Sequence, residues 1–124
     1  MNLLLDTLST PKNFLRWLLS HPESAIVGQA RSSNGCPLAN FLSAQGFDNC
    51  EVMTGNVAAR FEQDFYWLSD RPQMRTENRY LPTWASLFVA LVDEEPTKAV
   101  SALRALKALV EAIEVAELPR RVAA

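Results

Sequence analysis

The stretch 97–117, TKAVSALRALKALVEAIEVAE, decides the fold of this chain of 124 residues. Its large apolar residues recur at helical spacing, and alanines stand between them at every third or fourth position from Ala99 to Ala116. Thr97 is a suitable N-terminal cap, and Leu118-Pro119 is a stop signal because the residue before a proline avoids the helical conformation. We predict a helix over 97–117 and a frayed tail over 119–124.

One face of this predicted helix is a candidate association surface. Leu103, Leu106, Val110 and Ile113 follow a 3-4-3 spacing, which is compatible with a short coiled-coil seam. Leu109 and the alanines widen the apolar side, and a helix that is apolar around much of its circumference must be covered on more than one side. Two interpretations stay open: a central core helix, or a helix partly covered by a second subunit in a homodimer.

Working outward, three further helices are expected, and each carries apolar residues at helical spacing. In the best defined of them, Trp84, Leu87, Phe88 and Leu91 fall at i, i+3, i+4 and i+7. The expected segments are 10–20, 37–45 and 82–93. The fold class that follows is mostly α, of the α+β type, in a single compact domain of residues 1–124.

The stretch 50–61 admits two interpretations. As a β-hairpin, Gly55-Asn56 is a two-residue turn and the numbers of opposed residues sum to 111, which sets Val52 across from Ala59. As a loop followed by a helix, Asn56 caps the helix, but Asp64 then falls inside the apolar stripe. The hairpin is preferred for that reason. Two polar stretches, 28–36 and 69–80, are expected to be loops.

Composition excludes several classes of protein. The chain is 48% hydrophobic and 21% charged with a net charge of −2, which excludes a disordered tail and does not suggest a nucleic-acid binder. No apolar stretch reaches the roughly 18 residues of a membrane span. One histidine and two cysteines without a local pair predict no metal site, and no cofactor motif is present. We expect a cytoplasmic protein with reduced thiols.

Cys36 is the main catalytic candidate. It precedes Pro37 at the start of the predicted second helix, where the positive end of the helix dipole favours a thiolate. His21 is the only histidine and therefore the only imidazole available as its base. The alternative is structural: Cys36 caps a helix or is buried, and His21 caps the C-terminal end of the first long helix.

A second candidate is the series Arg71, Arg75 and Arg79, flanked by Trp67 and Tyr80. Spacing by four would align these arginines on one helix face, and basic groups beside aromatic rings bind single-stranded nucleic acid. The intervening acids and Pro72 favour a solvated loop instead. Overall, the sequence favours a non-enzymatic protein–protein interaction or regulatory module, with a Cys36-dependent thiol enzyme and a nucleic-acid-associated regulator as the alternatives.

Overall fold

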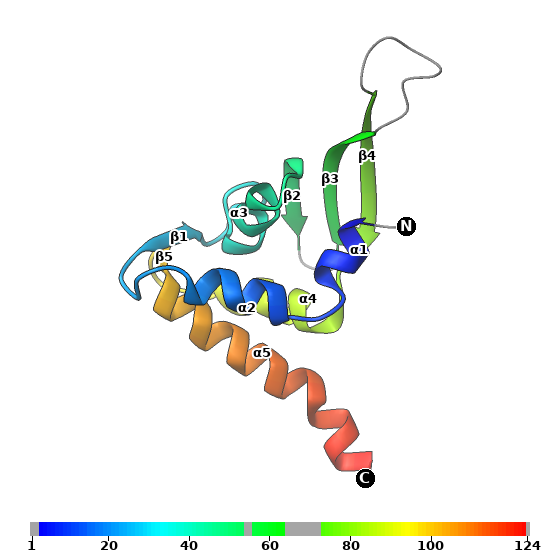
Figure 1. Ribbon diagram of the computed structural model, residues 1–124. Coiled ribbons are helices and arrows are strands. Elements are labelled where there is room, and N and C mark those ends of the chain that lie inside the picture. The colour runs from blue at the N-terminus through cyan, green and yellow to red at the C-terminus, as the bar shows by residue number, and fades with distance from the viewer. Residues whose placement is uncertain (1–2, 54–55, 64–72, 124) are drawn as a thin grey trace.

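The computed structural model describes residues 3–53, 56–63 and 73–123 (Figure 1). The prediction of a mostly α fold of the α+β type is confirmed. The helices are α1 (Leu3–Leu8), α2 (Lys12–Leu19), α3 (Pro37–Ala44), α4 (Thr83–Asp93) and α5 (Ala102–Ala123). The strands are β1 (Ile26–Gln29), β2 (Asp48–Met53), β3 (Asn56–Gln63), β4 (Gln73–Tyr80) and β5 (Ala99–Ser101).

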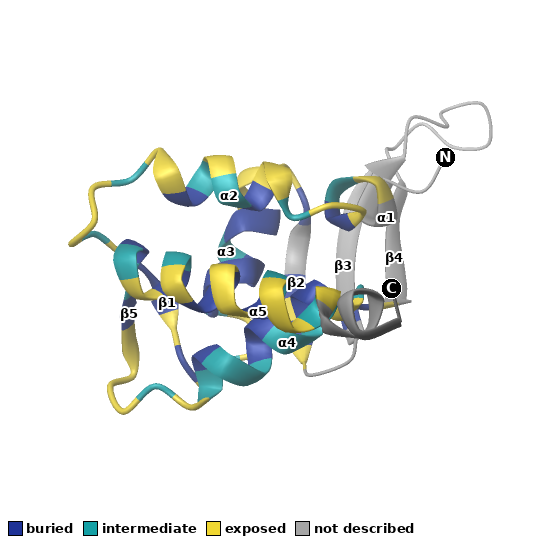
Figure 2. Cartoon of the chain, turned by 90° about the horizontal axis from the view of Figure 1, so that it is seen from below, coloured by how far each residue is buried: buried dark blue, intermediate teal, exposed yellow. Residues whose placement is uncertain are grey.

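Phe14 of α2 lies at the centre of the core, where it is fully buried. Its ring packs against Phe41 of α3, with 5.3 Å between ring centroids, and edge-on against Phe88 of α4 at 4.9 Å. Such pairs contribute about 0.5–1.5 kcal/mol each beyond the area they bury. Figure 2 shows α3 largely buried among its neighbours. The apolar stripes predicted for these helices therefore meet in one cluster.

The start of the last helix differs from the prediction. Residues 99–101 are a strand, β5, that pairs antiparallel with β1, and α5 begins only at Ala102. This pairing buries Val27 and Val100 on the core side. Ser101, rather than Thr97, caps the helix, since its hydroxyl accepts a hydrogen bond from the Arg104 N–H at 3.2 Å. Tertiary pairing with β1 overrides the local helical pattern here.

The hairpin predicted over 50–61 is confirmed, but its register is wrong. Val52 of β2 pairs with Val57 of β3 rather than with Ala59, and residues 54–55 at the turn lie outside the described residues. A shift of two residues leaves the same set of residues on each face because strand side chains alternate. The observed register sets two buried β-branched residues directly opposite each other, a favourable cross-strand pair.

The prediction of a polar loop over 69–80 is wrong for residues 73–80. They form β4, which pairs with β3 along its whole length from Gln73 opposite Gln63 to Tyr80 opposite Asn56. The backbone N–H and C=O groups of β3 need partners, and an edge strand that supplies them can have a polar composition. The expected loop over 28–36 is likewise wrong for Gly28 and Gln29, which belong to β1.

The end of the last helix also differs from the prediction. Helix α5 continues through Pro119 to Ala123, so the expected stop at Leu118-Pro119 is wrong and residues 119–123 are not a frayed tail. Residue 124 lies outside the described residues. The fixed φ of proline is compatible with the helical conformation. Because proline has no backbone N–H, the helix lacks one hydrogen bond at this position. In Figure 1 this C-terminal part of α5 extends away from the other elements.

Candidate interaction surface

Helix α5 faces the core with its alanines. Ala105, Ala112 and Leu109 are fully buried, and Ala102 and Ala108 are nearly so. Their small side chains let α5 approach α4 and α2 closely, with which it packs. The interpretation of this element as a core helix is therefore correct for its alanine side.

The predicted seam lies on a different side of α5. Residues 103, 106, 110 and 113 fall within one arc of the helix, about 80–160° around from Ala105 at 100° per residue. Val110 remains 47% exposed, while Leu103, Leu106 and Ile113 are half-buried. Ile113 packs against the core cluster. The core thus covers the seam only in part, and its most exposed member is Val110.

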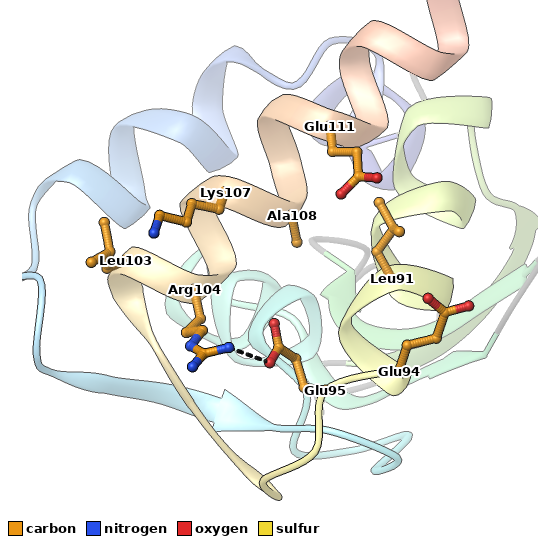
Figure 3. Close-up of a pocket in the computed structure, with 8 residues that line it drawn as sticks. All are labelled: Leu91, Glu94, Glu95, Leu103, Arg104, Lys107, Ala108 and Glu111. Carbon is orange, nitrogen blue, oxygen red and sulfur yellow. Dashed lines mark hydrogen bonds and ion pairs between the residues drawn. The ribbon is translucent and has the colours of Figure 1, made fainter.

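A groove of about 630 Å³ runs along the other exposed side of α5, between α5 and the C-terminal end of α4 (Figure 3). Leu91, Ala108 and Leu103, which also belongs to the seam, supply its apolar part, and an ion pair of 3.1 Å between Arg104 and Glu95 lies at one end. Its size suits a small ligand, but its lining is rich in charges of both signs, unlike most ligand pockets. The charged residues are Glu94, Glu95, Arg104, Lys107 and Glu111.

Cys36 occupies the predicted position at the N-terminus of α3, but its thiol is not activated. Its Sγ accepts a hydrogen bond from the Ala39 N–H at 3.4 Å, and the residue is only 3% exposed. Burial raises the pKa of the Cys36 thiol above 9.0, and Asp93 adds to the rise, against the lowering effect of nearby backbone N–H groups. Desolvation outweighs the helix terminus, so the structural interpretation of Cys36 as a buried cap is the one that fits.

His21 is placed as the helix-capping interpretation expected. Its Nδ1 lies 2.7 Å from the Trp17 carbonyl oxygen in the last turn of α2, and its ring stands edge-on to the Trp17 ring with 4.6 Å between centroids. These partners belong to α2, whereas the hydrogen-bond partner of Cys36 belongs to α3. Among the described residues, no hydrogen bond joins the Cys36 thiol to the His21 imidazole.

Arg75 and Arg79 do not lie on a helix. Arg75 and Arg79 lie in strand β4, paired with Phe61 and Val57 of β3, and Arg71 lies outside the described residues. The helical spacing that motivated a nucleic-acid site is therefore not realised over 73–80.

No helix in the described part of the chain is long and apolar enough to cross a membrane. Within residues 3–53, 56–63 and 73–123, no three or more His, Cys, Asp or Glu side chains cluster in a way that could hold a metal ion. Comparisons with protein-family models, with curated proteins and with solved structures found no match.

The sequence reasoning missed the charged groove and one contact behind it. Arg31 donates its backbone N–H to the Asp93 carboxylate at 2.8 Å and its guanidinium to the carbonyl oxygens of Asp93 and Glu95, at 3.1 and 2.7 Å. This holds the acidic end of α4 in place beside α5. The acids of 93–95 were visible in the sequence, but nothing local linked them to an arginine 62 residues earlier.

Proposed function

We propose that this protein is a non-enzymatic interaction module that associates with a second copy of itself through the α5 seam, Leu103, Leu106, Val110 and Ile113. The observation that supports the proposal is the 47% exposure of Val110 in the middle of an otherwise half-buried apolar row. Each large apolar side chain that association buries fully contributes up to about 1.5–3 kcal/mol. The buried thiol of Cys36, which is in no disulfide, is consistent with the further proposal of a cytoplasmic location.

The size of the seam indicates a weak dimer. Stable interfaces bury about 800 Å² on each partner, and a single row of four side chains, three of them already half-buried, falls short of this area. We therefore expect an equilibrium between monomer and dimer that shifts with protein concentration, rather than a permanent dimer. A reversible contact of this kind suits a regulatory role. Cys36 is buried, and its thiol and the His21 imidazole hydrogen-bond different backbone groups, so neither supports the thiol-enzyme alternative.

Sedimentation velocity from micromolar to millimolar protein tests the proposal. The wild-type mass should rise from one chain toward two, and Val110→Glu should stay at one chain throughout. Val115→Glu is the matched control, because Val115 is similarly exposed at 40% but lies about 140° around the same helix. A wild type that stays monomeric at millimolar concentration overturns the proposal, as does equal loss of the dimer in both variants.

A further inference from the structure

We infer that Asn34 is a site of spontaneous deamidation, in which the Ser32 hydroxyl relays the proton that moves when the ring closes. Asn34 is the one asparagine of this sequence that a glycine follows, and a glycine leaves its own backbone nitrogen unhindered. The Asn34 side chain is exposed. It lies in a turn between β1 and α3 that a hydrogen bond from the Cys36 N–H to the Ser32 carbonyl oxygen closes at 3.1 Å. The inference does not depend on the association of two chains.

A single hydroxyl group joins the two groups that react in deamidation. The Ser32 hydroxyl donates a hydrogen bond to Asn34 Oδ1 at 3.2 Å and accepts one from the Gly35 N–H at 3.1 Å. The Gly35 nitrogen is the nucleophile, and the side-chain carbonyl of Asn34 is the group that it attacks. Both distances lie within the roughly 2.6–3.2 Å that general acid–base catalysis requires. The hydroxyl is therefore placed to take a proton from the nitrogen and to pass its own proton to Oδ1.

The chemistry balances with water as the co-reactant. The Gly35 nitrogen forms a bond to Asn34 Cγ while its proton moves through Ser32 Oγ to Oδ1. The bond from Cγ to Nδ2 then breaks, and Nδ2 leaves as ammonia with the proton of the new hydroxyl, so that the carbonyl reforms in a cyclic imide. Water opens the imide at either carbonyl carbon and gives aspartate or isoaspartate. Ser32, Asn34 and Gly35 line a surface cavity of about 350 Å³, through which water reaches the ring.

Deamidation changes the contact between β1 and α3. The Gly35 carbonyl oxygen accepts hydrogen bonds from the Gln29 N–H at 2.8 Å and from the Asn40 side-chain amide at 3.3 Å. An isoaspartate at position 34 adds a methylene group to the backbone directly before Gly35, which displaces this carbonyl group. Either product also adds one negative charge to a chain whose formal net charge is −2. The modified chain therefore differs from the new one both in charge and in how β1 is held.

Peptide mapping of the folded chain by mass spectrometry, after incubation at mildly alkaline pH, tests the inference. The wild type should gain aspartate and isoaspartate at position 34. Ser32→Ala should do so at least about tenfold more slowly, because the proton relay is lost. Asn40 is the internal control and should keep its amide, since this amide donates a hydrogen bond to the Val27 carbonyl oxygen and no glycine follows it. In concentrated urea, which removes the relay, the two chains should react at equal rates.

Two results overturn the inference. A folded wild type that keeps the Asn34 amide while the unfolded chain loses it would show that the turn protects this asparagine. A folded Ser32→Ala chain that reacts as fast as the wild type would show that the hydroxyl relays no proton. If Ser32→Ala does not fold, Ser32→Thr and Ser32→Val replace it, because their side chains have the same shape and differ in the hydroxyl. The threonine variant should then react at least about tenfold faster than the valine variant, and equal rates would contradict the relay.

Discussion

Gly28 of β1 and Pro37 of α3 touch so closely that a Cβ atom at Gly28 would lie 2.4 Å from the Pro37 backbone nitrogen. The carbonyl carbon of Cys36 would be only 2.7 Å away. Both neighbours are backbone atoms at the start of a buried helix, so they cannot rotate aside. This contact, together with the bond from the Asn40 side chain to the Val27 carbonyl at 2.8 Å, holds β1 against α3.

We expect Gly28→Ala to lower the free energy of unfolding by about 3 kcal/mol or more, because overpacking against backbone atoms cannot be relieved by side-chain rotation. Urea denaturation measures the change. Gly35→Ala is the control: its Cβ would meet the movable hydroxyl of Ser32 at 2.9 Å, and the effect should be clearly smaller. Equal losses in the two variants would contradict the importance of the β1–α3 contact.

Arg31 has a strained backbone conformation, and its guanidinium makes hydrogen bonds that stabilise the fold. Its φ of 57° is one that residues with side chains rarely adopt, and its guanidinium binds the carbonyl oxygens of Asp93, the last residue of α4, and of Glu95. Arg31→Ala should lose the bonds and keep the strain, whereas Arg31→Gly should lose the bonds and relieve the strain. We expect the glycine variant to be more stable than the alanine variant by about 1 kcal/mol in thermal unfolding. The opposite order would contradict the positive φ.

The buried thiol of Cys36 predicts a loss of stability at high pH. The unfolded thiol ionises near the ordinary pKa of 9.0, and burial raises the pKa in the folded state. Below pH 9 both states keep the proton and the thiol contributes no pH dependence. Above it the unfolded state loses the proton first, so the free energy of unfolding falls by at most about 1.4 kcal/mol per pH unit.

The measurement is the difference in unfolding free energy between the wild type and Cys36→Ser across pH 8 to pH 10 or so. The serine hydroxyl retains a capping acceptor and does not ionise in this range. A difference that stays constant with pH would show that the thiol is exposed to water in the folded state.

The alanine side of α5 predicts a contrast between two substitutions on one helix. Ala112 is fully buried, whereas Ala116 one turn later is only half-buried. We expect Ala112→Leu to destabilise the fold by about 1–3 kcal/mol through overpacking. Ala116→Leu should change stability little, because the side chain has room at the edge of the core. Chemical denaturation compares them, and a harmless Ala112→Leu would argue against close packing of α5.

The sequence indicated helices α2, α3 and α4 and the 50–61 hairpin, but it missed strands β1, β4 and β5. Apolar residues at helical spacing identified 37–45 and 82–93 almost to the residue, because a buried helix face leaves a periodic record along the chain. Cys36, Pro37 and Gly46 marked the ends of α3, and Gly46 indeed has a φ of 101°. Strands β1 and β5 have four and three residues and pair across about 70 positions of sequence, which leaves no local periodicity to detect.

The helical periodicity of the sequence also determined part of the candidate surface. The sequence by itself placed Leu103, Leu106, Val110 and Ile113 on one arc of a helix, since this follows from 3.6 residues per turn. Only the tertiary structure decided that the alanines face the core and that Val110 stays 47% exposed. It also decided that Cys36 is buried. Exposure and pKa depend on which distant elements pack nearby, and that is a property of the folded chain rather than of any one segment.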